Sequence, residues 1–228
     1  IMGAVFGLCI CVGFSMPETA SAKKVSSTLK NGVFTVTGKG KMSESAMPKA
    51  AQKKKIKKIV IKNGVTVLPE DAFRDCSNAT SISIASSVKK IGAKAFFNTG
   101  VKKITIPKKA VNLGYGLLQN CKNLQEITIP GHFDAMEPEK AANKKDTIGT
   151  LILGKGNLNI VKKVKFSTNF DGNCHSLLGD CENFEILETD PYYKSIDGCI
   201  YTRDGKKLVV VPYGKKEIDI AEGCEVVD

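Results

Sequence analysis

Short triplets in which two apolar residues flank a variable position recur along the chain at nearly constant intervals. The clearest are Ile59-Val60-Ile61, Ile82-Ser83-Ile84, Ile104-Thr105-Ile106, Ile127-Thr128-Ile129 and Val164-Lys165-Phe166. Their starts lie 23, 22, 23 and 37 residues apart. Alternation with period two predicts a short strand with one buried face. Because a single strand of this kind cannot bury that face alone, the spacing predicts a stack of repeats that share one interior.

Each triplet has companions at fixed distances along the chain. An apolar residue follows fourteen positions after the triplet begins, at Phe73, Phe96, Leu118 and Leu178. A cysteine follows after seventeen positions in three of the repeats, at Cys76, Cys121 and Cys181, whereas the second repeat has Asn98-Thr99-Gly100 there. Burial of each large apolar side chain is worth roughly 1.5–3 kcal/mol. The predicted shared core consists of Ile59, Ile61, Phe73, Cys76, Ile82, Ile84, Phe96, Ile104, Ile106, Cys121, Ile127, Ile129 and Cys181.

These motifs resemble those of the BspA-type leucine-rich repeat family. The segments Val65–Cys76 and Val88–Phe96 match its V-x-x-I-G-x-x-A-F-x-x-C pattern, and Ile104–Pro107 and Ile127–Pro130 match its I-x-I-P strand. Residues 190–201 resemble a hairpin segment often found between such repeats. The resemblance implies a β-rich α/β repeat solenoid, right-handed and curved, with a parallel β-sheet on its concave face. It also implies a bacterial surface or secreted protein that acts in adhesion.

The first 22 residues are predicted to be a signal peptide that has lost its basic start. An uncharged apolar run at 1–14 is followed by Ala20-Ser21-Ala22, which has the form of a signal-peptidase site. The alternative is a buried element of the fold. A signal peptide predicts a secreted or cell-surface location and a protein that is not embedded in a membrane once the signal is removed.

The remainder divides into a cap and a repeat region. Residues 23–55 are expected to form an N-terminal β cap, with a strand after the turn at Asn31-Gly32. Residues 56–228 are expected to be repeats. Within them we predict an irregular insertion at about 131–159, a β-hairpin insertion at about 190–216 around Asp204-Gly205, and a last repeat that opens at Ile218-Asp219-Ile220 and is cut off at 228.

The six cysteines that remain after residue 22 are even in number, which in an exported protein suggests disulfides. Three of them share one repeat position, however, and this predicts buried free thiols that pack as small apolar groups. Cys224 falls on a core position of the last repeat, whereas Cys174 and Cys199 have no repeat counterpart. The chain has no C-x-x-C pair, no phosphate-binding loop and no nucleophile motif, so we expect no metal, no cofactor and no enzymatic activity.

The formal net charge of +11 favours anionic partners. Several basic and hydroxyl side chains occupy strand positions that point away from the core. The candidate ligand-binding residues on this face are Lys57, Lys58, Ser83, Lys102, Lys103, Thr105, Thr128, Lys163 and Lys165. Our hypothesis is that this face binds an anionic polymer or glycoconjugate. The alternative is an ordinary solvated lysine face.

The expected function is therefore ligand binding at a bacterial surface, with a host, matrix or microbial-surface protein or an anionic glycan as partner. The alternative is a structural spacer or scaffold module of a larger exported protein. Specific nucleic-acid binding is not expected, because the predicted strand face lacks the aromatic side chains on which bases stack. We expect a monomer.

Overall fold

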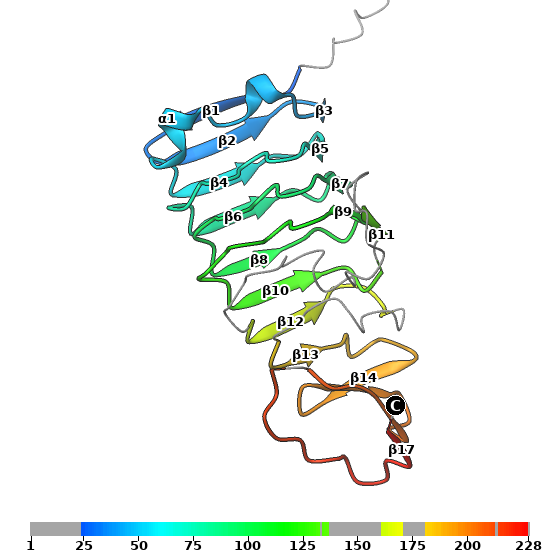
Figure 1. The fold of residues 1–228 in the computed structure, drawn as a ribbon. Helices are drawn as coiled ribbons and strands as arrows, with labels where there is room; N and C mark the ends of the chain where they lie inside the picture. Colours follow the sequence, from blue (N-terminus) through cyan, green and yellow to red (C-terminus); the bar gives the residue numbers. More distant parts are fainter. Residues whose placement is uncertain (1–23, 133, 137–160, 171–180, 213, 228) are drawn as a thin grey trace, which may run out of the picture.

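A computed structural model describes residues 24–132, 134–136, 161–170, 181–212 and 214–227. The predicted signal peptide, most of the predicted insertion at 131–159, Leu178, Cys174 and His175 lie outside the described residues. The described chain is a β-solenoid of stacked coils, in which equivalent strands lie above one another (Figure 1).

The predicted triplets form the long parallel face of the solenoid. Its strands are β2 (Val33–Thr37), β4 (Lys58–Ile61), β6 (Ser81–Ile84), β8 (Lys103–Thr105), β10 (Glu126–Ile129), β12 (Lys163–Phe166) and β13 (Phe184–Glu185). Hydrogen-bonded ladders join β2, β4 and β6, and separately β8, β10, β12 and β13, while β6 and β8 lie side by side. Equivalent triplets are in register, with Ile59 opposite Ile82 and Ile104 opposite Ile127.

A second parallel sheet runs along another side of the stack. Its strands are β3 (Gly40–Lys41), β5 (Val65–Leu68), β7 (Lys90–Ile91), β9 (Asn112–Gly114) and β11 (Asp134–Met136). A third side is formed by the segment that carries the apolar residue at position fourteen. There the amide of Phe73 donates to the carbonyl of Ala95, at 2.7 Å, and the amide of Phe96 donates to the carbonyl of Leu117, at 3.0 Å. Each coil is therefore three-sided, and backbone hydrogen bonds join successive coils on the second and third sides and within the two ladders of the long face.

The third side depends on paired residues with left-handed backbone conformation. In three successive coils, two such residues lie four positions apart, on either side of the buried apolar residues of that segment. The three pairs are Asp71 with Asp75, Lys94 with Asn98, and Gly116 with Asn120. Their φ angles lie between 52° and 64°. Glycine, asparagine and aspartate tolerate this region better than other residues do.

An antiparallel hairpin closes the N-terminal end. Strand β1 (Ser26–Lys30) pairs with β2 across a turn in which Asn31 and Gly32 have φ angles of 50° and 78°. The helices of the described residues are a 3-10 turn, η1 (Glu44–Ala46), and a single turn, α1 (Ala50–Lys53). Helix content is therefore low, and the α/β part of the predicted fold class is not confirmed.

The interior contains columns of equivalent side chains. The rings of Phe73 and Phe96 stack with centroids 5.6 Å apart, and the ring of Phe34 packs edge-on against Phe73 at 6.1 Å. Thr99 occupies the cysteine position of the second repeat, and its buried hydroxyl lies 3.2 Å from the thiol of Cys121. The structure buries these predicted core residues: Ile59, Ile61, Phe73, Cys76, Ile82, Phe96, Ile104, Ile106, Cys121, Ile127, Ile129 and Cys181.

Ile84 differs from the predicted core because it is only partly buried. It ends β6, whose hydrogen-bonded ladder is not continued by β8 among the described residues. The partial exposure of Ile84 thus coincides with a junction at which no ladder joins successive strands.

A small antiparallel sheet follows the last coil. It comprises β14 (Tyr193–Ile196), β15 (Cys199–Thr202) and β16 (Lys207–Val210), and β17 (Val226–Val227) pairs parallel to β16. The buried carboxylate of Asp190 attaches this sheet to the solenoid: it accepts hydrogen bonds from the amides of Tyr192 and Tyr193, both at 2.9 Å, and of Phe170, at 2.7 Å.

The predicted last repeat does not form a strand at Ile218-Asp219-Ile220. Ile218 and Ile220 are exposed, and Cys224 is only partly buried rather than in the core. A strand needs a neighbour that supplies hydrogen bonds, and the position beside β13 is taken by the β14–β15 hairpin, whose Gly198 carbonyl accepts from the amide of Phe184 at 2.8 Å. The alternating pattern of 218–220 therefore has no coil to join.

Candidate ligand-binding face and groove

The outward side chains of the long sheet form two straight rows. One row in β8, β10 and β12 consists of Lys103, Glu126 and Lys163, and the next consists of Thr105, Thr128 and Lys165, followed by Glu185 of β13. Strand pairing thus brings together five of the predicted ligand-binding residues: Lys103, Thr105, Thr128, Lys163 and Lys165.

Carboxylates neutralise the lysines of these rows. The ammonium of Lys103 lies 2.8 Å from Glu126, and Glu185 bridges Lys163, at 3.2 Å, and Lys165, at 2.9 Å. The hydrogen bond from Lys103 lowers the pKa of Glu126, and the hydrogen bonds from Lys165 and Lys163 lower the pKa of Glu185. The same bond raises the pKa of Lys165. This part of the face is a mixed-charge network and not the lysine face that the sequence predicts.

The remaining predicted residues take no part in these ion pairs. Lys57 lies just before β4, Lys58 begins β4 and Ser83 lies in β6, whereas Lys102 immediately precedes Lys103 of the network. All four side chains are exposed, and the three lysines have no ion pair among the described residues. Three of these four residues therefore lie in the coils before the network, and Lys102 adjoins it.

A groove of about 1050 Å³ opens where the long sheet meets the C-terminal sheet. Its lining includes the apolar residues Phe166, Ile186 and Leu187, which come from β12 and the segment after β13. The polar residues of the lining are Lys108, Thr128, Lys165, Ser167, Glu185, Glu188, Thr189, Lys194, Ser195 and Arg203.

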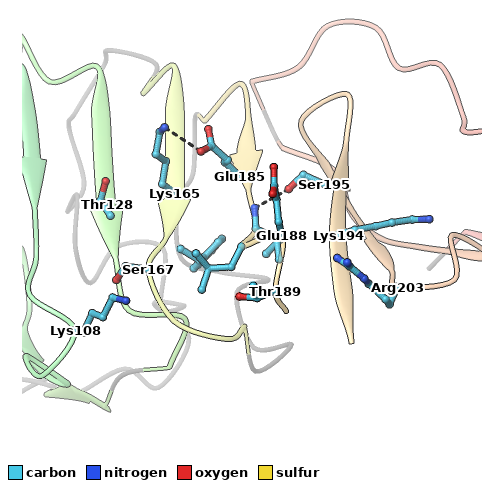
Figure 2. Close-up of a pocket in the computed structure, with 13 residues that line it drawn as sticks. Lys108, Thr128, Lys165, Ser167, Glu185, Glu188, Thr189, Lys194, Ser195 and Arg203 are labelled. Atoms are coloured by element: carbon cyan, nitrogen blue, oxygen red, sulfur yellow. Dashed lines mark hydrogen bonds and ion pairs between the residues drawn. The ribbon is translucent and has the colours of Figure 1, made fainter. Parts of the chain in front are cut away.

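Figure 2 shows how these polar side chains are arranged. Lys108 and Ser167 lie on one side, Arg203 lies on the other, and Thr189 lies between them. Lys194 points away from Lys165. The hydroxyl of Ser195 is fixed because it accepts the amide hydrogen of Ile186, at 2.7 Å, and the hydroxyl of Ser167 donates to the carbonyl of Ile129, at 3.0 Å.

Charges of both signs line this groove, and several of them are available to a ligand. Lys108 and Arg203 are exposed and make no ion pair with any described residue, and the same holds for Glu188. An apolar base with a polar, partly charged margin is the usual composition of a protein interface. The groove can therefore accept a ligand that has both apolar and charged groups.

Most of the groove was not predicted from the sequence. Thr128 and Lys165 were predicted to bind a ligand, but Lys108, Glu185, Glu188 and Arg203 were not. The hairpin after Asp190 brings Lys194, Ser195 and Arg203 to the groove, and the repeat pattern contains no signal for the packing of that hairpin against the last coil.

The cysteines of the described residues are free thiols. Burial raises the pKa of Cys76 and of Cys181 to about 12 and also raises the pKa of Cys121. A thiol with a raised pKa stays protonated and unreactive at neutral pH. No group of three or more potential metal ligands lies close together in the described parts of the chain, and no helix described there is long and apolar enough to cross a membrane.

The sequence matches one family model. A model described as a BspA-type leucine-rich repeat region matches residues 47–171 in six copies. No curated protein matches the sequence.

Solved structures that match this chain include three proteins. A leucine-rich repeat protein from Eubacterium ventriosum is 18% identical, with a TM-score of 0.52 over 91% of this chain and 54% of that chain. The pneumococcal vaccine antigen PcpA is 11% identical, with a TM-score of 0.44 over 89% of this chain and 58% of that one. A leucine-rich cell surface protein from Faecalibacterium prausnitzii is 14% identical, with a TM-score of 0.32 over 92% and 66%. The chain spans about half the length of the first structure, and that likeness supports the solenoid fold.

Proposed function

Because the chain belongs to the BspA-type leucine-rich repeat family, we propose that it is a protein of the bacterial surface or the extracellular medium that binds protein ligands and does not catalyse a reaction. The ligand is a segment of a host, matrix or microbial-surface protein, and it binds in the groove between the last coil and the C-terminal sheet. The signal-like sequence at residues 1–22 supports export.

The groove is the observation that carries this proposal. Its volume of about 1050 Å³ is at the upper end for small-ligand pockets and suits several residues of an extended peptide. Apolar contact with Leu187 would supply affinity, while Arg203, Lys108 and Glu188 would select the charge pattern of the ligand. Arginine is prominent among residues that anchor protein interfaces.

A bulky side chain in the middle of the groove tests the proposal. Thr189→Trp places an indole between Lys108 and Arg203, whereas Thr80→Trp makes the same change at an exposed position before β6, away from the groove. We expect panning of a library of random twelve-residue peptides on the wild-type protein to yield binders. Their affinity for Thr189→Trp should be at least about tenfold lower, which corresponds to a loss of about 1.4 kcal/mol.

Thr80→Trp should bind the same peptides as the wild type does. Peptides that bind both variants equally would place the binding surface elsewhere. Recovery of no peptide at all would favour the alternative function, a spacer or scaffold module of a larger exported protein.

A further inference from the structure

The positive charge of the chain is concentrated at the N-terminal end of the solenoid. Residues 24–66 contain eleven lysines and a single acidic residue, Glu44. Residues 67–228 contain 22 basic and 21 acidic residues, which is nearly neutral. Almost the whole net charge of +11 therefore lies in the cap and the first coil, at the opposite end of the stack from the groove (Figure 1).

The fold collects five of these lysines at one corner. Lys54 and Lys55 follow α1, and Lys57 and Lys58 lead into β4. The amides of Lys57 and Lys58 both donate to the carbonyl of Gly32, at 2.8 and 3.1 Å, so the β1–β2 turn lies against them.

Lys30 ends β1 immediately before that turn and is paired with Val33 of β2, which in turn is paired with Lys58. We refer to Lys30, Lys54, Lys55, Lys57 and Lys58 as the basic corner.

The lysines of the basic corner are not neutralised by carboxylates. Farther along the chain, Lys103, Lys163, Lys165, Lys206 and Lys215 each lie within 3.2 Å of a carboxylate. No described carboxylate forms an ion pair with a lysine of the basic corner, where Lys54 donates instead to the hydroxyl of Ser77 at 3.0 Å. Like charges held together disfavour the compact state, and an anionic partner removes that repulsion.

The side chains of the basic corner indicate the chemistry of the partner. Lysine is a compact point charge without the fixed fork by which arginine recognises individual phosphates or carboxylates. The five residues include no arginine, and no exposed aromatic side chain accompanies them in residues 24–66 on which a base could stack. Such a surface responds to the density of negative charge along a polymer and not to the shape of one group.

We infer that the basic corner binds a flexible anionic polysaccharide, at a site separate from the groove. Successive charged units of the polymer contact Lys30, Lys57 and Lys58 along the edge of the first coils, and Lys54 and Lys55 extend the contact across the segment after α1. Binding releases the counterions of the polymer, so its affinity falls as salt concentration rises.

The test uses dextran sulfate and uncharged dextran of equal length as probes, with the full chain titrated by calorimetry at about 0.05 and about 0.2 M salt. We expect the wild type to bind dextran sulfate only, with an affinity that falls at least about tenfold over this range. Lys55→Glu/Lys57→Glu/Lys58→Glu should weaken binding by at least about tenfold and make its salt dependence shallower.

The matched control is Lys62→Glu/Lys89→Glu/Lys90→Glu, which makes the same change in net charge at exposed lysines beyond the other end of β4 and at β7. It should change the affinity for dextran sulfate by less than about threefold. Lys55→Gln/Lys57→Gln/Lys58→Gln serves as a second, milder variant, and thermal unfolding of each variant verifies that it is folded. Thr189→Trp should leave binding of dextran sulfate unchanged, which separates this site from the groove.

Three results would overturn the inference. Equal losses in the two charge-reversal variants would mean that net charge alone attracts the polymer. Retention of full affinity in the Gln variant would place the site elsewhere. Binding of single-stranded DNA without binding of dextran sulfate would replace the polysaccharide by a nucleic acid.

Discussion

Glu185 lies within ion-pair distance of two lysines of the neighbouring strand. Its carboxylate is 2.9 Å from Lys165 and 3.2 Å from Lys163 and is about half exposed, at 45%. The same residue lines the groove, so it sets the local charge of both the strand face and the groove. A single residue that the repeat pattern does not mark thus turns a row of lysines into a balanced network.

Substitution of Glu185 tests that balance. Glu185→Gln should lower the free energy of unfolding by about 0.2–1 kcal/mol at pH 7, the range for exposed ion pairs. The lysines lower the pKa of Glu185 from its ordinary value of 4.5, so its stabilising effect is present above that value and disappears as the pH falls through the lowered pKa of the folded state.

The measurement is urea unfolding of the wild type and of Glu185→Gln at pH 7 and at about pH 3, where the difference between them should be smaller. Glu188→Gln is the control, because Glu188 also lines the groove but makes no ion pair with a described residue. A difference that stays the same at both pH values would show that Glu185 acts through packing and not through its charge.

At the scale of single elements, the sequence predicts the strands of the long sheet because their periodicity is local. Each triplet from Ile59 to Val164 contains its own alternation, and the fixed interval supplies the neighbour that completes the ladder. The triplet at Ile218 has the same alternation but lacks that neighbour, so the prediction fails there. Local pattern therefore suffices only where a coil is available to pair with it.

Other elements leave a weaker signal in the sequence. Most strands of the second sheet, β7 among them, are only two or three residues long, too short to show a period. The left-handed residues of the third side include Lys94, a type that seldom adopts that conformation. The groove requires the packing of two elements that follow different patterns, and no spacing within either one specifies that packing.

The glycine after the β7 strand shows how closely adjacent coils approach. A Cβ added to Gly92 would lie 2.5 Å from the carbonyl carbon of Pro69 and would also overlap the amide of Glu70 in the coil before. Gly114, one coil later, would meet the backbone of Gly92 and Ala93 in the same way. At Gly92 and Gly114 the second sheet therefore needs glycine, because the backbone of the coil before lies where a side chain would be.

Gly92→Ala should consequently destabilise the protein by about 1–3 kcal/mol, the usual cost of forcing one extra carbon into a packed interior. Chemical denaturation measures the loss. Ala93→Ser is the control, because it adds one atom at the adjacent half-buried residue, which already has a Cβ, and it should cost much less. Equal losses in the two variants would contradict the overlap between coils.

At the scale of the whole molecule, two kinds of organisation are superimposed on one stack. The apolar interior repeats from coil to coil, so the columns of phenylalanine and of cysteine or threonine extend through several layers. The surface does not repeat: it changes from uncompensated lysines at the cap to a mixed-charge network and a groove at the other end. A stack of this kind can offer two separate binding surfaces, because each coil contacts mainly its neighbours and its outward residues are independent of the interior.

The same architecture predicts how damage to one layer spreads. Phe73 is fully buried and stacks on Phe96, so Phe73→Ala should cost about 3–5 kcal/mol. Since stability in a solenoid is a sum over coils and their interfaces, we expect the loss to be local. Amide hydrogen exchange, followed by mass spectrometry, should accelerate in β4 and β6 and in the cap that supplies Phe34, and should stay unchanged in β15 and β16.

Phe97→Ala is the matched control for this local loss. Phe97 is adjacent in sequence to Phe96, but it is only half-buried, and its ring lies beneath the guanidinium of Arg74, 4.4 Å from the ring centre. Its removal should accelerate exchange far less, because little of the cavity that it leaves is in the interior. If Phe73→Ala instead accelerated exchange equally in every coil and in the C-terminal sheet, the stack would unfold as one cooperative unit, and the two binding surfaces could not be energetically independent.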